Sequence, residues 1–330
     1  MTALPAIDIT PLLAMDDAAA VERTAAAIGA ASADYGFFYA EGHGIADALF
    51  DRLEAVSHRF FALSEAEKAE IAMAHGGAAW RGWFPLGGEL TSGRPDRKEG
   101  LYLGEELGEG DPRVAAGWPL HGANLWPTRL PELRPAVEEY LAASVAAAEA
   151  LMRGMALALG LSADHFANEL TRRPTLLFRI FHYPPNGDAD DLGVGEHSDY
   201  GLLTLLGQDR HGGLEVRAAD GSWIAVPPRG HALVVNIGDM FERLTRGRFR
   251  SAPHRVINAS GRERLSWPLF YDPDFAASVD PLPVPATTRL LPRWDGADVH
   301  AAGGSYGDYL IGKVGKVFPA LAGKQLRELP

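Results

Sequence analysis

The chain has 330 residues, and its 31 Lys and Arg against 43 Asp and Glu give a formal net charge of −12 at pH 7 with His neutral. A hydrophobic content of 47% indicates a globular protein with a large core, not a disordered or fibrous chain. Because there is no Cys, disulfides, Fe–S clusters, thiolate zinc sites and Cys nucleophiles are excluded, and any metal must be held by His, Asp or Glu. The negative charge disfavours a broad surface for nucleic acid or anionic membranes.

No stretch approaches the roughly 18 uninterrupted apolar residues of a membrane span. The first residues also lack the basic start and apolar run of a signal peptide. We therefore expect a cytoplasmic protein, and a monomer is the simplest expectation for its assembly.

The first half of the chain is predicted to be mainly helical. Apolar spacing indicates helices over 17–33, 47–63 and 133–161, with short strands at 6–9 and 36–39. The sequence Ser64–Glu67 has the S-x-x-E form of a helix-capping box. Residues 76–130 are rich in Gly and Pro and are predicted to be an irregular rim or lid over a site.

The second half has a different pattern. Short apolar runs are separated by Gly, Pro and Asp turns, as is typical of a β-sandwich or closed barrel. The predicted strands lie at 176–183, 202–206, 214–217, 223–226, 232–237, 254–257 and 265–271. Helices ahead of a block of strands predict an α+β fold.

Candidate metal ligands occur in this second half. His197-Ser198-Asp199 is the only H-x-D in the chain, and its spacing places both side chains on one face of an extended segment. His254 opens a later predicted strand. Two imidazoles and one carboxylate form the facial triad that holds Fe(II) with open positions for substrate and O2. The alternative is that both histidines are ordinary core or turn residues.

A candidate carboxylate-binding group follows. Arg264 and Ser266 occupy same-face positions of a predicted strand, and Tyr183 ends an earlier one. The planar guanidinium fork suits a carboxylate, and the two hydroxyls would add donors. A metal triad beside such a group is what a 2-oxo-dicarboxylic acid requires. A salt bridge for Arg264 and core packing for Tyr183 are the alternatives.

Several motifs then resemble the isopenicillin-N-synthase-like branch of the Fe(II)/2-oxoglutarate-dependent oxygenases. In chain order they are Glu196–Leu206, Gln208–Val216, Asn236–Asp239, His254–Val256 and Arg264–Ser266. Weaker similarity extends into the N-terminal half, through Gly36–Tyr39 and Arg81–Trp83 among others. The segment Phe178–Tyr183 together with His197–Gly201 is nearer to microbial members, such as thymine 7-hydroxylase and the ethylene-forming enzyme.

The resemblance implies a double-stranded β-helix (jelly roll) wrapped by N-terminal helices. It implies an enzyme that uses Fe(II), 2-oxoglutarate and O2 to oxidise a small molecule, with release of succinate and CO2. The implied iron ligands are His197, Asp199 and His254; the implied ligands of the distal carboxylate of 2-oxoglutarate are Arg264, Ser266 and Tyr183; the implied substrate-lining residues are Arg179, Tyr200 and Phe270. The expected division is 1–130 for the helical region and rim, 131–174 for a supporting helix, 175–280 for the core and 281–330 for a C-terminal extension with a helix, all in one structural unit.

Other functions stay open at this point. The chain could be an oxidase that needs no 2-oxoglutarate, like the namesake enzyme, or a jelly-roll protein that binds a small molecule or metal without oxidising it. Hydroxylation is the expected reaction, with desaturation, cyclisation and ethylene formation as alternatives.

Two other patterns are predicted to carry no chemistry. Gly303–Gly307 matches the G-x-S-x-G of hydrolases, but no His follows it, so we predict a turn that caps a helix. The arginines between 243 and 255 are predicted to be a solvated loop with local acidic partners, and a patch for nucleic acid or an anionic substrate is the alternative.

Overall fold

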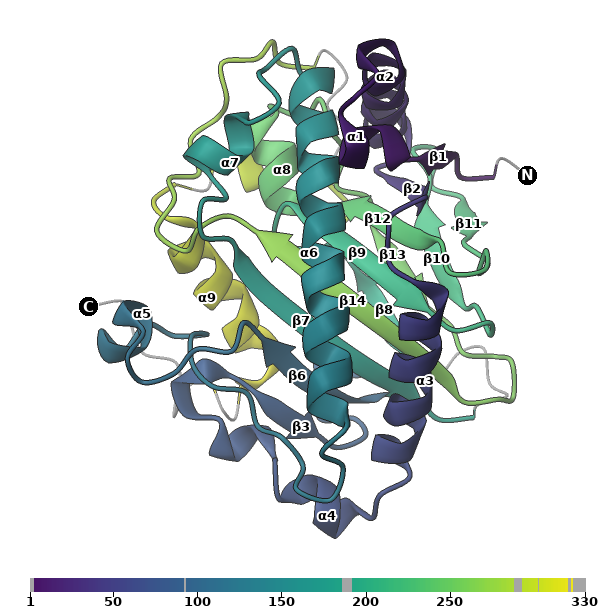
Figure 1. Cartoon of the computed structure of the whole chain (residues 1–330), viewed down its shortest axis with the longest axis vertical. Coiled ribbons are helices and arrows are strands. Elements are labelled where there is room, and N and C mark those ends of the chain that lie inside the picture. Colours follow the sequence, from purple (N-terminus) through teal and green to yellow (C-terminus); the bar gives the residue numbers. More distant parts are fainter. Residues whose placement is uncertain are drawn as a thin grey trace.

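The protein is described by a computed structural model covering residues 3–91, 93–185, 192–287, 293–301, 303–319 and 322 (Figure 1). Parts of the predicted C-terminal extension, at 288–292, 302, 320–321 and 323–330, lie outside the described residues. The described residues form an α+β fold with the predicted jelly-roll core, which confirms the predicted fold class.

The strands form one large and one smaller sheet. The large sheet has eight strands in the order β1-β2-β12-β9-β14-β7-β6-β3, the smaller sheet has four in the order β11-β10-β13-β8, and β4 pairs with β5. The bounds are β1 Ala6–Asp8, β2 Phe37–Glu41, β3 Gly82–Phe84, β4 Leu90–Thr91, β5 Arg94–Pro95, β6 Glu99–Gly104, β7 Thr175–Tyr183, β8 Val194–His197, β9 Leu203–Gln208, β10 Leu214–Arg217, β11 Trp223–Ala225, β12 Leu233–Ile237, β13 His254–Val256 and β14 Arg264–Asp272.

Helices surround the sheets, and α6 crosses the front of the large sheet in Figure 1. The bounds are α1 Thr10–Ala14, α2 Ala18–Asp34, α3 Asp47–Phe61, α4 Glu65–Ala69, α5 Pro112–Ala115, α6 Leu133–Ala158, α7 His165–Glu169, α8 Asp239–Leu244 and α9 Tyr306–Val317, with short 3-10 turns at Met73–His75, Gly77–Ala79 and Val299–Ala301. Side-chain caps set several of their starts: Asp17 accepts hydrogen bonds from the first turn of α2, and Ser64 with Glu67 forms the predicted capping box of α4.

The prediction that 76–130 is irregular is wrong for part of that segment. β3 and β6 lie there, and β6 pairs with β7 to extend the large sheet. The glycines that suggested a loop allow close packing instead. A Cβ on Gly100 would lie 2.6 Å from Phe84 and 2.8 Å from Phe181, and one on Gly104 would lie 2.2 Å from Arg81.

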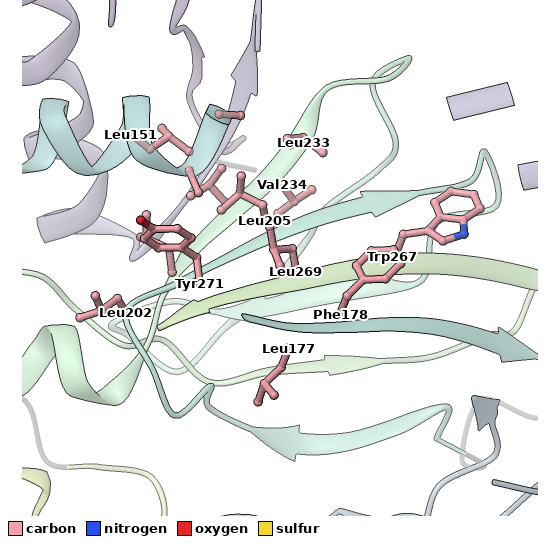
Figure 2. Packing of buried hydrophobic residues seen from close by; sticks show 14 of the residues in the cluster. Leu151, Leu177, Phe178, Leu202, Leu205, Leu233, Val234, Trp267, Leu269 and Tyr271 are labelled. Atoms are coloured by element: carbon pink, nitrogen blue, oxygen red, sulfur yellow. The ribbon is translucent and has the colours of Figure 1, made fainter. Parts of the chain in front are cut away.

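Side chains of the central strands alternate between two environments. Phe178 and Ile180 of β7 are buried in the core cluster, and Phe178 packs against Tyr140 of α6. Figure 2 shows Leu151 of α6 near Leu205 and Tyr271 of the sheet, while Leu177 lies on the opposite side of the strands. The period-2 alternation of β7 therefore divides a packed apolar face from a second face, which lines a cavity.

α6 is the one helix among the described residues that is long and apolar enough to cross a membrane by length and composition. Half of its most apolar window is buried inside the protein, against the sheet and against α2 and α3. It serves here as the central core helix.

Close packing of α2 on α6 gives a stability prediction. A Cβ on Gly29 of α2 would lie 2.9 Å from the Cβ of Ala158, which the α6 backbone holds in place. Gly29→Val is expected to lower the free energy of unfolding by about 1–3 kcal/mol, because the helices must separate. Urea denaturation measures the loss, with Ala27→Val on the exposed face of α2 as the control. Equal losses in both variants would show that β-branching in the helix, and not helix packing, causes the effect.

Candidate active site

Two histidines and one carboxylate meet on the smaller sheet. His197 ends β8, His254 begins β13, and the two are cross-strand partners. Asp199 lies two residues beyond the end of β8, so the strand does not include both ligands of the H-x-D motif. One ligand atom from each residue lies within 4.8 Å of the other two. The structure thus brings all three predicted metal ligands together.

Backbone hydrogen bonds orient both imidazoles. Nδ1 of His197 lies 2.8 Å from the carbonyl oxygen of Gly195, and Nδ1 of His254 lies 3.2 Å from that of Ala252. Since a carbonyl can only accept, Nδ1 carries the proton in each ring and Nε2 is left as the ligand atom. The two Nε2 atoms lie 3.8 and 3.7 Å from Oδ1 of Asp199.

Side chains of the large sheet orient the carboxylate in the same way. Oδ2 of Asp199 accepts hydrogen bonds from Asn236 Nδ2 at 2.7 Å and from the Thr204 hydroxyl. Oδ1 remains directed toward the two imidazoles. Such outer partners hold metal ligands in position.

The protonation states also suit a metal. Burial and the neighbouring His197 lower the pKa of His254 to about 4, which keeps this imidazole neutral at pH 7. Burial opposes ionisation of Asp199, but His254, His197 and the hydrogen bonds from Asn236 and Thr204 outweigh burial and lower the pKa of the carboxyl. Neutral imidazole and ionised carboxylate are the forms that bind divalent cations, and this donor set fits Fe(II).

A buried cation lies in the same cavity. Arg264 begins β14 opposite Tyr183 of β7, is completely buried, and has no ion pair with any described residue. Its Nη2 donates to Gln208 at 3.3 Å, whereas its Nε and Nη1 have no hydrogen-bond partner. Ser266 follows on the same face and also lines the cavity. The guanidinium carbon also lies 4.7 Å from the centre of the Tyr183 ring. A buried charge without an anionic partner is costly, so the site fits an anionic ligand such as the distal carboxylate of 2-oxoglutarate.

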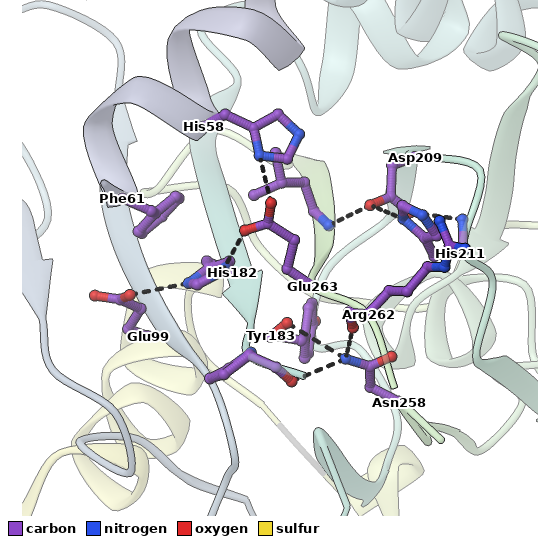
Figure 3. Close-up of polar contacts among 12 residues, drawn as sticks. His58, Phe61, Glu99, His182, Tyr183, Asp209, His211, Asn258, Arg262 and Glu263 are labelled. Carbon is purple, nitrogen blue, oxygen red and sulfur yellow. Dashed lines mark hydrogen bonds and ion pairs between the residues drawn. The ribbon is translucent and has the colours of Figure 1, made fainter. Parts of the chain in front are cut away.

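Polar contacts near the start of β14 connect the strand ends (Figure 3). The Asn258 side-chain amide donates to the carbonyl oxygens of Tyr183 at 3.3 Å and of Arg262 at 2.9 Å. Asp209 accepts a hydrogen bond of 2.6 Å from the backbone of Leu265. These bonds tie the β13–β14 connection to the ends of β7 and β9, so the backbone that carries the cation is held in place.

The site opens into a cavity of about 410 Å³. Both sheets, the β3–β6 region and α9 contribute to its wall. All three predicted substrate-lining residues, Arg179, Tyr200 and Phe270, belong to it. Arg179 is buried, its guanidinium carbon lies 3.5 Å from the centre of the Tyr102 ring, and its Nη1 donates to two backbone carbonyls.

Further charged residues of this wall were missed by the sequence prediction. Lys98 is almost fully buried and pairs with Asp96 and, at 2.9 Å, with Glu89. Glu89 also accepts a hydrogen bond of 2.5 Å from Tyr102. The acidic and basic residues of the 76–130 segment could have indicated a charged part of the site. The Gly and Pro residues of the same segment led instead to the prediction of an irregular loop.

The part of the wall formed by α9 is connected to the metal group through Asp239. This buried carboxylate pairs with Arg293 at 2.9 Å and accepts a hydrogen bond from Tyr309 of α9 at 3.1 Å. Its backbone N–H donates to the carbonyl oxygen of Asp199 at 2.7 Å, and Arg293 donates to Ser198 at 3.0 Å. One residue, through its carboxylate and its backbone N–H, therefore joins α9 and the 293–295 segment to the loop that carries a metal ligand.

The two patterns predicted to carry no chemistry have structural roles. Ser305 and Asp308 form the capping box at the start of α9, which confirms the predicted helix-capping turn. The prediction of a solvated arginine loop is wrong for Arg243, which is buried and donates to the backbone carbonyl of Val279. Arg255 pairs with Glu215 of the neighbouring strand.

Asp272 gives this site a pH-dependent contribution to stability. It ends β14, lies against Gly201, and accepts hydrogen bonds from Leu202 N at 3.1 Å and Tyr306 at 2.5 Å. Burial raises the pKa of its carboxyl from 3.8 to about 7. The folded state thus holds this proton more tightly than the unfolded state, so the stabilisation is full below about pH 4 and is lost as the pH rises through 7.

Asp272→Asn removes this titration. The difference in melting temperature, variant minus wild type, should therefore increase from pH 5 to pH 7 and level off above it. Thermal unfolding of the metal-free protein across this range measures the difference. A difference that does not change with pH would contradict the prediction.

Comparison with known protein families agrees with this geometry. Residues 174–273 match the family model described as 2OG-Fe(II) oxygenase superfamily, and residues 4–129 match that described as non-haem dioxygenase in morphine synthesis N-terminal. The chain belongs to the 2OG-Fe(II) oxygenases.

Individual relatives of this oxygenase support the assignment along the whole chain. It is 44% identical over 318 residues to a probable iron/ascorbate oxidoreductase of Dictyostelium discoideum, covering 87% of each chain. It is 36% identical to homoarginine-6-hydroxylase 2-ODD-C23 of Glycine max, covering 95% of this chain and 96% of that one. Among solved structures, a full-length Neurospora crassa protein in complex with alpha-KG and 5-formyluracil matches with a TM-score of 0.78 and 25% identity, over 94% of this chain and 95% of that one.

The predicted family, enzyme class and cofactors are thereby confirmed: this 2OG-Fe(II) oxygenase uses iron, 2-oxoglutarate and O2 on a small molecule.

Proposed function

We propose that this 2OG-Fe(II) oxygenase hydroxylates a small polar molecule within the 410 Å³ cavity. In this proposal the iron is held by His197, Asp199 and His254, and the distal carboxylate of 2-oxoglutarate is bound by Arg264, Ser266 and Tyr183. The observation that carries the proposal is the presence, in one cavity, of an oriented metal donor set and a buried Arg264 with two unpartnered N–H-bearing atoms.

The protein's own groups have distinct tasks. When bound, the iron supplies the oxidising chemistry with O2, while 2-oxoglutarate is converted to succinate and CO2. Asn236 and Thr204 keep Asp199 turned toward the metal, and Arg264 fixes one end of the cosubstrate. Residues of α9 and Trp294 line the same cavity and would shield the reacting atoms from water.

The cavity wall supports a substrate that carries both signs of charge. Arg179 can pair with a carboxylate, and Tyr200 and Phe270 offer aromatic surface. Glu89 already pairs with Lys98, and its carboxylate can also contact a cationic group of the substrate. An amino acid with a basic side chain meets these requirements, and the Glycine max relative is named for homoarginine. We therefore propose basic amino acids as the first substrates to test.

One structural feature bears on each of the two competing functions, an oxidase without 2-oxoglutarate and a binding protein without activity. In an oxidase that needs no 2-oxoglutarate, Arg264 would have to pair with a carboxylate of the substrate itself. A binding protein without activity has no need for both an oriented triad and this buried cation.

We also propose that the enzyme acts as a cytoplasmic monomer, without nucleic-acid or membrane partners. The net charge of −12 supports the lack of nucleic-acid partners, and the packing of α6 against the sheet supports the lack of membrane partners.

The decisive experiment measures succinate and O2 consumption by the Fe(II)-loaded protein with 2-oxoglutarate. The panel contains homoarginine, arginine, lysine and thymine, with His254→Ala as the inactive control. A substrate should raise succinate release above the uncoupled rate and yield a product heavier by one oxygen atom. O2 consumption without succinate would indicate an oxidase instead, and 2-oxoglutarate binding without either would indicate a binding protein.

A further inference from the structure

Gln208 lies next to Arg264, which lines the cavity. It is the last residue of β9 and the cross-strand partner of Ser266, which lines the cavity. Directly paired residues of antiparallel strands point to the same face, so Gln208 points inward as Ser266 does. Thr204 and Leu206, at alternate positions of the same strand, also line the cavity.

The orientation of the Gln208 amide follows from its neighbour. An arginine side chain can only donate hydrogen bonds, so the Gln208 atom that faces Arg264 Nη2 at 3.3 Å must be the carbonyl oxygen. The amide nitrogen therefore points elsewhere, and this buried Nε2 has no hydrogen-bond partner. Buried donors without partners are rare, because each costs free energy.

Three buried donor atoms of this neighbouring pair are thus left without hydrogen-bond partners: Nε and Nη1 of Arg264 and Nε2 of Gln208. From this we infer that Gln208 is a specificity-determining residue, which donates to the distal carboxylate of 2-oxoglutarate and holds the Arg264 guanidinium in line with it. The inference rests on the proposed binding of that carboxylate at Arg264. In this role Gln208 adds a neutral hydrogen-bond donor beside the guanidinium, and this donor favours a dicarboxylic 2-oxo acid over a 2-oxo acid that ends in a methyl group.

The test compares two ligands that share the keto-acid end. Calorimetry with the Mn(II)-loaded protein gives the dissociation constants of 2-oxoglutarate and of 2-oxobutanoate, which lacks the distal carboxylate. Gln208→Met keeps the length of the side chain and removes the donor. It should weaken 2-oxoglutarate about 10- to 100-fold, as expected for a hydrogen bond to a charged group, and leave 2-oxobutanoate within about twofold. Arg210→Ala is the control: Arg210 is exposed, lies two residues after Gln208, and its replacement should change neither dissociation constant.

A second variant keeps the test informative if Gln208→Met does not fold. Gln208→Glu has the shape of the wild type but places a carboxylate on Arg264, and it should weaken 2-oxoglutarate further while sparing 2-oxobutanoate. Equal losses for both ligands, or no loss for either, would overturn the inference. Failure of the wild-type protein to bind 2-oxoglutarate would instead overturn the proposed function.

Discussion

Asp199→Ala should weaken binding of a divalent metal by more than about 100-fold, because loss of a ligand exceeds the roughly 10- to 100-fold effect of changing an outer partner. The variant also leaves the Asn236 amide without its acceptor, because this amide donates to Asp199 at 2.7 Å in the wild type. Calorimetric titration with Mn(II) measures the affinity directly, and succinate release should fall to the level of metal-free protein.

Thr204→Val provides the matched control for this variant. It removes one hydrogen bond to Oδ2 and leaves the carboxylate and the Asn236 bond in place. We expect a loss of metal affinity of about tenfold, well short of that in Asp199→Ala. Metal binding by Asp199→Ala equal to that of the wild type would place the iron elsewhere in the protein.

Arg264→Met should separate cosubstrate binding from stability. Without the guanidinium, the dissociation constant of 2-oxoglutarate should rise more than about 100-fold, because at least two charge-assisted hydrogen bonds are lost. The ligand-free variant should melt at or above the wild-type temperature, because an unpaired buried charge is replaced by an apolar chain of similar length.

Two measurements on Arg264→Met test both parts. Thermal unfolding without and with 2-oxoglutarate should show no ligand-induced shift in the variant and a clear shift in the wild type. Arg262→Ala, two residues earlier on the exposed side of the same connection, should behave as the wild type. Strong destabilisation of the ligand-free Arg264→Met protein would indicate that the guanidinium serves the fold and not the ligand.

The site residues that could be predicted from the sequence are those that belong to a short motif or to a periodic run of apolar residues. Arg264 and Ser266 are two positions apart in β14, so strand geometry brings this pair to one face. His197 and Asp199 have the same spacing and His254 opens an apolar run, although Asp199 lies just past the end of β8. The helices over 18–34 and 133–158 follow from their apolar spacing in the same way.

The remaining site residues depend on contacts between distant segments. Gly100 and Gly104 read as loop residues, yet they belong to β6 because Phe84, Phe181 and Arg81 occupy the space that a side chain would need. Lys98 directly precedes that strand and is brought into the cavity wall by it, where it pairs with Glu89. The residues around Asp239 give no indication that it pairs with Arg293, because Arg293 is 54 positions away in the sequence. Such long-range pairings are set by tertiary packing, which local periodicity does not report.

The unpaired charge of Arg264 also has a consequence for the amount of folded enzyme in a cell. A ligand that binds only the folded state stabilises it by about 2.7 kcal/mol at 100 times its dissociation constant. Because 2-oxoglutarate relieves a cost built into the empty protein, the folded population should rise with the concentration of this cosubstrate. Where 2-oxoglutarate is scarce, the empty enzyme should be the form that proteases remove first.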